Sequence, residues 1–503
     1  MTSTFHGIEV GKRGLFAQQA ALSTTGHNIA NAGTVGYTRQ RVNMQATNPI
    51  SVPGMSSYQL GTGVDVNKIE RLREDYLDIQ YRTENKNVGY WEAKSDTLSK
   101  IEGLLNEPSD NGLAYVMDQF WSSWEELAKN PDSASARSVV RQRGVAVAET
   151  FNYLSNSLDD IKKDLKLVIS TKQSDLNSIT KQIANLNDQI ARLEANNYEP
   201  NDLYDQRDVL IDQLSKMVDI TNVTKLDSGM VNITVAGQEL VSGTNYKEIE
   251  VVYDSDTNPS YVQGVIIKEP GVQLSPDEIK TALENALDLS SGELLARIES
   301  YGTTAGGVIP DIKKSLNQFA TEFVNQVNTL HQQGYYMEKK ADGSISMEPA
   351  TGIDFFSWNA DNSLDISADI KSSLDKIAAA QEEGSGTGTS SSGNGNNAQA
   401  IAKLKNNGTI TIDGTTATFS DFYRNIIGQI GIDSQEAQRM KDNSDVIVQQ
   451  VENRRQSVSG VSLDEEMANM IKFQQAYNAA ARMITTMDQC LDKVINGMGR
   501  VGL

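Results

Sequence analysis

The period of the hydrophobic pattern changes along this chain and then returns to its starting value. Near both ends and over several interior stretches, apolar residues recur at steps of three and four, which predicts amphipathic helices. Between about residues 219 and 269 the step changes to two, as in Val231, Ile233 and Val235, which predicts β-strands. The predicted order is therefore helices, a strand-rich insert, and helices again.

The last predicted helix carries an apolar column that the helix alone cannot bury. The column is interrupted by Gln474 and Asp488, and its members are Met467, Met470, Tyr477, Ala481, Ile484, Leu491 and Ile495. A single stripe of this kind needs a partner surface, because packing rather than intrinsic propensity stabilises most helices. We expect a seam that binds another helix, with the core of its own domain as the alternative partner.

The first 29 residues carry a narrower column of the same kind. Its members repeat mainly every seven residues and are Phe5, Ile8, Leu15, Leu22 and Ile29. Small residues beside it, including Gly11, Gly14 and Ala17, permit close approach by a neighbour. We therefore expect the two terminal helices to pair with each other and then with copies of the same chain.

The interior stripes predict a bundle of long helices. Residues 133–196 form one or two very long helices whose seam skips one residue at Lys172, a change that relaxes supercoiling without ending a helix. A second stripe, Leu113 to Leu127, lies between two prolines, and a third covers residues 312–330. Further along, Phe355, Phe356 and Trp358 are expected to form a buried anchor.

These patterns predict a mainly α fold in which the chain runs out and back. Residues 1–65 and 458–503 are expected to form a terminal coiled-coil assembly domain, and residues 66–220 and 300–457 a long helical bundle. Residues 221–299 form the predicted β-rich insert, which we place at the far tip. Residues 383–397, rich in Gly, Ser and Asn, are predicted to be a flexible low-complexity loop.

Composition narrows the class of partner. The formal charge is −21, which disfavours nucleic acid and anionic membranes as partners, since both require basic surface. No apolar run is long enough to span a bilayer, and the first residues lack the apolar core of a secretory signal. The single cysteine, Cys490, allows no intrachain disulfide and no cysteine metal cluster.

The search for catalytic chemistry gives one weak candidate. Asp202, Asp205 and Asp208 lie near a predicted helix start, where they serve either as a hydrolytic carboxylate pair or as capping and ion-pairing groups. The three histidines have no acidic or cysteine neighbour at metal-ligand spacing. We predict a protein that is not an enzyme, with no cofactor and no metal.

Four stretches resemble one bacterial family. Residues 28–39, NIANAGTVGYTR, are similar to the N-terminal signature of flagellar rod, hook and hook-associated proteins, and its matching positions are Asn28, Asn31, Thr34, Gly36 and Tyr37. Residues 457–484 are similar to the other end of the same family. Residues 201–215 and 323–335 narrow the resemblance to its hook-associated members.

The resemblance implies a structural axial protein that joins hook to filament and assembles into a tubular homo-oligomer through its terminal helices. It also implies export by the flagellar type III apparatus without a cleaved signal peptide, and an extracellular location in the flagellum. The implied partners are the hook protein, hook-associated protein 3 and a cytoplasmic export chaperone on the C-terminal helix. We expect the terminal helices to be disordered before assembly.

The sequence leaves two alternative functions open. One is a hook or rod subunit of the same family, which the interior match at residues 201–215 disfavours. The other is a soluble cell-wall hydrolase with a coiled-coil dimerisation segment, for which the sequence shows no catalytic group.

Overall fold

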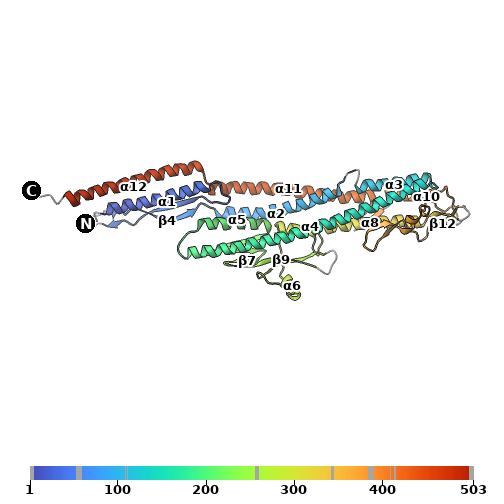
Figure 1. The fold of residues 1–503 in the computed structure, drawn as a ribbon, viewed down its shortest axis with the longest axis horizontal. Coiled ribbons are helices and arrows are strands. Elements are labelled where there is room, and N and C mark those ends of the chain that lie inside the picture. The colour runs from blue at the N-terminus through green and yellow to red at the C-terminus, as the bar shows by residue number, and fades with distance from the viewer. Residues whose placement is uncertain are drawn as a thin grey trace, which may run out of the picture.

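The chain forms an elongated rod whose long helices run close to its long axis (Figure 1). Helices α1 (His6–Asn31) and α12 (Leu463–Gly497) make up the end that holds both termini. The other long helices form a bundle that reaches the opposite end. The computed structural model describes residues 5–51, 59–107, 109, 112–254, 260–340, 345–382, 390–407, 409–412 and 415–497.

The bundle consists mainly of helices that the hydrophobic pattern predicts. Its long members are α2 (Asp75–Leu105), α3 (Leu113–Lys129), α4 (Ala134–Glu194), α5 (Asn201–Met217), α8 (Val308–Gln332) and α11 (Phe419–Ser459). Helix α4 is continuous over 61 residues, so the skip at Lys172 does not interrupt it. Its first turn is capped by the Ser133 hydroxyl, which accepts a hydrogen bond from the Ala136 N–H. The mainly α fold class is confirmed.

Short helices and antiparallel strand pairs complete the fold. The short helices are α6 (Pro276–Leu283), α7 (Glu293–Tyr301), α9 (Ala368–Ser372), α10 (Asn396–Asn407) and the 3₁₀ helix η1 (Leu374–Lys376). The two-stranded pairs outside the insert are β1 (Gln40–Ala46) with β4 (Val64–Arg71), β2 (Ile50–Ser51) with β3 (Gln59–Leu60), β11 (Tyr335–Lys339) with β12 (Ile345–Pro349), β13 (Phe356–Trp358) with β14 (Leu364–Ile366), and β15 (Thr409–Ile412) with β16 (Thr415–Thr418). Among the described residues, no helix is long and apolar enough to cross a bilayer.

The end of the bundle away from the termini is built around aromatic rings. Phe323 on α8 lies 5.7 Å from the Phe120 ring and 5.5 Å from Trp121 on α3, measured between ring centroids. Phe356 and Phe419 also pack against the Phe323 ring, and all five side chains are buried. Trp358, the third member of the predicted anchor, is instead partly exposed at the end of β13. The anchor therefore consists of Phe355 and Phe356.

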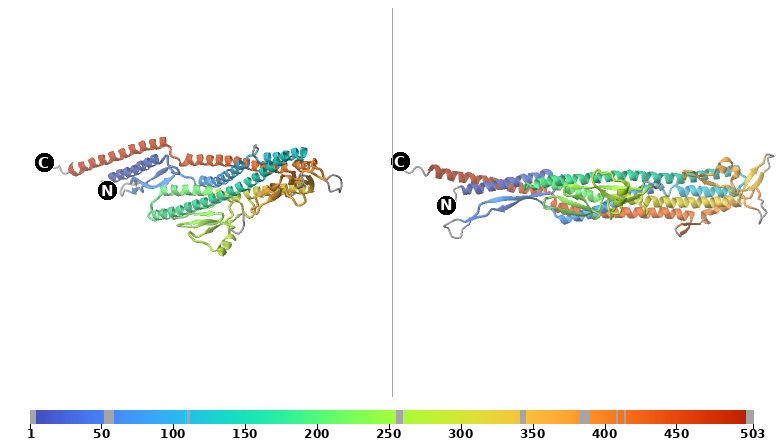
Figure 2. Two further views of the ribbon diagram at one scale, coloured as in Figure 1. Left: turned by 45° about the vertical axis from the view of Figure 1, so that its right-hand side comes forward. Right: turned by 90° about the horizontal axis from the view of Figure 1, so that it is seen from below.

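The strand-rich insert lies along the side of α4 and not at the far tip of the rod, which corrects the predicted placement (Figure 2). It contains a four-stranded antiparallel sheet in the order β5 (Ile220–Lys225), β6 (Val231–Val235), β7 (Gln238–Ser242), β8 (Asn245–Tyr246), and a hairpin of β9 (Glu248–Tyr253) with β10 (Val262–Lys268). The Asn187 amide on α4 donates to the carbonyls of Val231 and Gly243. These bonds hold the sheet against the helix, while strands at the far tip come from β11 and β12.

The predicted flexible loop at residues 383–397 lies outside the described residues as far as residue 389. The described remainder of the segment, residues 390–397, is held in place by hydrogen bonds. The Asn394 amide donates to the Gln381 carbonyl at 2.8 Å, and the buried Asn397 amide donates to the Ala378 carbonyl at 2.8 Å. Helix α10 already begins at Asn396, so this part of the segment is built into the fold.

Candidate assembly interface

Helices α1 and α12 pack antiparallel along a seam of glycines. A Cβ built on Gly7 would lie 2.7 Å from Met487 Cε, one on Gly11 would lie 2.8 Å from Ile484 Cγ1, and one on Gly14 would lie 3.8 Å from Ala480 Cβ. The numbers rise along α1 as they fall along α12, which defines the antiparallel register. Because glycine has no side chain, the α12 side chains reach almost to the α1 backbone. The expected pairing of the two ends is therefore present within one chain.

The structure places the α12 residues of the predicted seam in two groups. Met470, Tyr477, Ala481, Ile484 and Leu491 are half-buried on the side that faces α1. Met467 and Ile495 are 50% and 68% exposed and do not take part in the contact with α1 of the same chain, so their place in an assembly seam stays a prediction. A different second column completes the seam beside Met470, Tyr477, Ile484 and Leu491. Its members are buried or half-buried and are Glu466, Phe473, Ala480 and Met487.

The N-terminal column is displaced in a similar way. Phe5 is 60% exposed, while Ile8, Leu15, Leu22 and Ile29 are half-buried at the flanks of the helix contact. The buried positions of α1 are small or polar and comprise Gly11, Ala17, Ala21, Thr24, Thr25 and Asn28. Close packing selects residues without bulk at the point of contact, so the larger aliphatic residues are pushed to the flanks. The pattern of apolar residues alone therefore misses the α1 side of the seam.

The outer surface of the pair keeps an apolar face. Phe16 on α1 and Leu463, Met467, Ile471 and Ile495 on α12 are all exposed. Leu463, Met467 and Ile471 follow one another at steps of four and therefore share one face of α12, and exposed apolar side chains that lie side by side in this way indicate contact with another molecule. We call these five residues the outer apolar face.

The family signature folds around one buried amide. The Asn28 side chain, 1% exposed, donates to the Gln40 carbonyl at 2.8 Å and to Glu466 Oε2 at 3.0 Å. Its oxygen accepts from the Gln40 N–H at 3.0 Å and from the Tyr37 hydroxyl at 2.8 Å. All four hydrogen-bonding positions of the amide are thus used. Asn28 therefore fixes the turn after α1 and ties it to the start of α12.

The other signature residues shape the same turn. The Asn31 amide donates to the His27 carbonyl, and the Thr34 hydroxyl donates to Asn31 Oδ1. Gly36 has a φ of +79°, and a Cβ there would lie 2.0 Å from Val209 Cγ2 on α5, so only glycine fits. Burial, followed by the nearby carboxylates, raises the pKa of the Tyr37 hydroxyl, which keeps it protonated as the donor to Asn28.

Two cationic residues connect the signature to the ends of other helices. The Arg39 guanidinium binds Glu466 at 2.7 Å and Glu465 at 2.7 Å in the first turn of α12. The Thr38 N–H donates to Asp205 Oδ2, and Arg71 at the end of β4 binds Asp205 and Asp208 of α5 at 2.8 and 2.9 Å. The N-terminal signature, the 201–215 stretch and the start of α12 therefore meet at one place, although they are far apart in sequence.

A buried charge network continues from there into the bundle. Its cations are Arg71, Arg73, Arg82 and Arg455, and its anions are Asp78, Asp205, Asp208 and Asp212. Burial raises the pKa of Asp208, but Arg73, Arg71 and Arg82 outweigh it and hold that pKa below its usual range. For Asp205, burial outweighs Arg71 and leaves the pKa raised. We call these eight residues the junction network, because they join α2, α5 and α11 to β4 and, through Asp205, to Thr38 after α1.

The junction network also accounts for the candidate carboxylates. Asp205 and Asp208 are bound by arginines, and Asp202 accepts hydrogen bonds from Gln40 at 2.8 Å and from His27 at 3.2 Å. Each carboxylate therefore has a structural role. In the part of the chain that the structure describes, no cluster of three His, Cys, Asp or Glu side chains could hold a metal ion.

Comparison with known proteins then decides the family. A model described as the flagellar hook-associated protein FlgK helical domain matches residues 98–356, and models of flagellar basal body rod proteins match residues 8–38 and 453–497. Flagellar hook-associated protein 1 of Bacillus subtilis (strain 168) is 40% identical, with 99% of each chain covered. The chain belongs to the flagellar hook-associated protein 1 family. As a member of this family, it is a structural axial protein of the bacterial flagellum.

More distant relatives agree with that assignment. Flagellar hook-associated protein 1 of Escherichia coli (strain K12) is 28% identical and covers 96% of this chain and 98% of its own. The structure of the flagellar hook junction protein FlgK from Burkholderia pseudomallei superimposes with a TM-score of 0.58 at 14% identity, covering 76% of this chain and 100% of that one. This likeness shows the shared fold. The resemblance to hook-associated proteins is confirmed.

Proposed function

We propose that the chain forms a ring or tube of identical subunits at the hook–filament junction, and that α1 and α12 make the contacts between subunits. The observation that carries this proposal is the outer apolar face. It remains exposed after α1 and α12 have closed their own seam, so it is free to contact a neighbouring copy. Covering each of these side chains contributes about 1.5–3 kcal/mol.

The α1–α12 pair leaves most of the described part of α12 half-buried or exposed, which fits a part that is completed by assembly. Its seam is lined by glycine, alanine and threonine on α1, and Glu466 is the only buried residue among the described residues of α12. We propose that the pair orders fully when neighbouring copies cover it. A chain that keeps its ends loosely structured until assembly suits passage through a narrow export channel.

The remaining assignments are part of the same proposal. Hook protein would lie on one side of the ring and hook-associated protein 3 on the other. Export would use the flagellar type III apparatus without a cleaved signal peptide, and a cytoplasmic chaperone would cover the C-terminal helix beforehand. The strand-rich insert would face outward, because it stands on the side of α4 away from the terminal pair.

The test compares apolar-to-acidic changes on two surfaces in intact cells. Met467→Asp with Ile471→Asp places charge on the outer apolar face, and we expect incorporation into flagella to fall at least tenfold. Tyr153→Asp with Leu167→Asp makes the same chemical change at exposed positions of α4 and should leave incorporation unchanged. Removal of residues 464–503 should abolish incorporation while the bundle stays folded.

Two results would contradict the proposal. One is normal incorporation of the truncated chain, measured by immunoblot of isolated flagella. The other is equal loss in both double variants, since that would assign the contact to the whole surface. Release of soluble fragments from purified cell wall by the isolated chain would instead favour the hydrolase alternative.

A further inference from the structure

Two segments of the described chain connect the terminal pair, α1 and α12, to the bundle. Residues 72–74 lead from β4 into α2, and residues 460–462 lead from α11 into α12. Helix α12 is offset from α11, so the chain changes course at the second connection (Figure 1). Because each connection is only three residues of non-helical chain, other contacts have to fix the orientation of the terminal pair relative to the bundle.

Both connections meet at the main chain of one residue, Arg39. Its N–H donates to the Ser459 carbonyl at 2.8 Å, and its carbonyl accepts from the Leu72 N–H at 2.8 Å. Ser459 is the last residue of α11, where the carbonyl groups have no donor within the helix. Arg39 therefore satisfies the end of α11 and joins it to the segment that leads into α2.

The side chain of Arg39 holds the start of α12. Its guanidinium binds Glu465 at 2.7 Å and Glu466 at 2.7 Å. The Glu466 side chain is 3% exposed and that of Arg39 is 18% exposed, so salt screens this ion pair little. Removal of one partner from a buried ion pair is strongly unfavourable, because the other charge is then left without its counterion away from water.

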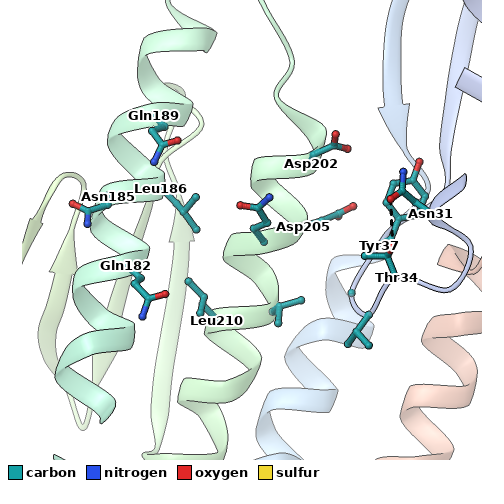
Figure 3. Close-up of a pocket in the computed structure, with 14 residues that line it drawn as sticks. Asn31, Thr34, Tyr37, Gln182, Asn185, Leu186, Gln189, Asp202, Asp205 and Leu210 are labelled. Atoms are coloured by element: carbon teal, nitrogen blue, oxygen red, sulfur yellow. Dashed lines mark hydrogen bonds between the residues drawn. The ribbon is translucent and has the colours of Figure 1, made fainter. Parts of the chain in front are cut away.

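Side-chain packing fills little of the space beside these contacts. A cavity of about 620 Å³ lies between the signature turn and helices α4 and α5 (Figure 3). Gly36 packs on Val209 at this cavity, and Asp205, which points from α5 toward the turn, accepts from the Thr38 N–H. Since the cavity takes the place of a packed core, the orientation of the terminal pair depends on polar contacts, and those of Arg39 reach both connections.

We propose that Arg39 is a positioning residue that fixes the orientation of the terminal pair relative to the bundle. Without the guanidinium, the Glu466 carboxylate moves toward water and the start of α12 moves with it. The consequence for assembly rests on the proposed function. Neighbouring copies meet through the terminal pair, so its orientation decides whether the outer apolar face reaches the next copy.

The experiment measures the orientation directly, by pulsed electron paramagnetic resonance between two spin labels on the isolated chain. In a Cys490→Ala background, the labels are attached at Gln475→Cys on α12 and Asn443→Cys on α11, both exposed positions. We expect a narrow distance distribution in this parent chain. Arg39→Gln should broaden the distribution at least twofold.

A second label pair shows whether the bundle itself has changed. It combines Asn443→Cys with Ser174→Cys, an exposed position on α4, so both labels lie in the bundle. Its distance distribution should stay the same in the parent and Arg39→Gln chains. Broadening of this pair as well would give Arg39 a general role in folding and would overturn the inference.

Two further variants separate the position from the chemical change. Arg41→Gln removes an identical guanidinium two residues later, but Arg41 binds Glu70 within the β1–β4 pair at 2.7 Å and its side chain is 62% exposed. The distribution between α11 and α12 should therefore stay narrow. Arg39→Lys keeps a cation beside Glu466 and should restore most of the narrow distribution.

The same measurement yields two other contrary results. One is equal width in the Arg39→Gln and Arg41→Gln chains. The other is a parent distribution already as broad as that of Arg39→Gln, since the contacts would then not fix the orientation in a single chain. Either result would overturn the inference and leave the proposed function intact, because the isolated chain is measured without assembly.

Incorporation into flagella tests the consequence for assembly. Immunoblots of isolated flagella should show at least a fivefold loss for Arg39→Gln and none for Arg41→Gln. Normal incorporation of an Arg39→Gln chain whose label distribution has broadened would overturn the step from orientation to assembly. Normal incorporation of the Met467→Asp, Ile471→Asp chain would instead remove the proposed function, while the distance measurements would still support the positioning role of Arg39.

Discussion

Each end of the rod is stabilised by a different kind of contact. At the end away from the termini, rings from α3, α8, β13 and α11 interlock, with the Phe120 and Phe323 centroids 5.7 Å apart and both side chains buried. At the terminal end, glycines on α1 meet side chains of α12, and the outward face of both helices stays exposed. The first region buries its apolar surface within one chain, whereas the second leaves part of it exposed, as the proposed assembly requires. On the proposed function, this difference separates a body that is stable by itself from an element that neighbouring copies complete.

The largest effect is expected in the aromatic core. Phe323→Ala removes a fully buried ring that packs on α3, α4, β13 and α11, and should lower the free energy of unfolding by about 3–5 kcal/mol. Urea denaturation followed by circular dichroism measures this change. Ile471→Ala on the outer apolar face should change it by no more than about 0.5 kcal/mol. Similar losses in the two variants would erase the contrast between the ends.

The bundle should also respond to mild acid through His331. This buried side chain on α8 binds the Ile353 carbonyl through Nδ1 and accepts from the Ala378 N–H through Nε2, and burial lowers its pKa to about 4. The unfolded chain takes up the proton at a higher pH, near 6.5, so the folded state is favoured above that pH. Stability should fall by roughly 3 kcal/mol as pH drops from 7 to 4.

Urea denaturation at pH 7, 5.5 and 4.5 measures that dependence. His331→Asn has no titrating group at this position and should show a shallower pH profile in the same window, from a lower starting stability. Parallel profiles for the two proteins would show that another group carries the pH response.

An intermediate effect is expected where the terminal pair meets the bundle. Asn28→Ala removes four hydrogen bonds and leaves buried partners unsatisfied, at a local cost of about 1–3 kcal/mol. Hydrogen exchange should become faster around residues 28–40 and 459–470, with little change in α4 and α8. Asn31→Ala is the control, because Asn31 is less buried and bonds mainly within its own turn. Uniformly faster exchange over the whole chain would contradict a separate terminal unit.

The smallest effect should come from two single methyl groups on the glycine seam. Gly14→Ala gains helix propensity and makes ordinary contact with Ala480, so it should stabilise α1 by about 0.5–1 kcal/mol. Gly11→Ala forces Ile484 to move and should cancel that gain or reverse it. Hydrogen exchange rates of the α1 amides in the two variants measure this difference. Equal protection in both would show that Ile484 lies further from Gly11 than the structure places it.

Much of the architecture follows from hydrophobic period alone. The stripes between Pro108 and Pro131 and over residues 133–196 correspond to α3 and α4, because a bundle helix buries one face and therefore repeats with helical period. The placement of the insert could not be predicted in this way. Apolar residues of α4 such as Leu176 and Ile183 share a core cluster with the strands, but a periodic pattern does not say which element covers them. Asn187, Asn177 and Gln173 of α4 also hydrogen-bond to the strands, and they are not part of the apolar pattern.

The sequence determined that both ends of this chain form helices in need of partners, and that Asn28, Gly36 and Tyr37 belong to a flagellar signature. It also identified one of the two columns of the α12 seam, which consists of Met470, Tyr477, Ile484 and Leu491. These residues belong to the seam whether the second column runs through Met467 and Ala481, as predicted, or through Glu466 and Ala480, as observed. Only the tertiary structure decided which companion column completes the seam, because that choice depends on where the glycines of α1 admit side chains. It likewise brought three distant motifs together beside the junction network, through Arg39 with Glu466 and Thr38 with Asp205. Contacts between remote segments produce no periodic pattern in the sequence.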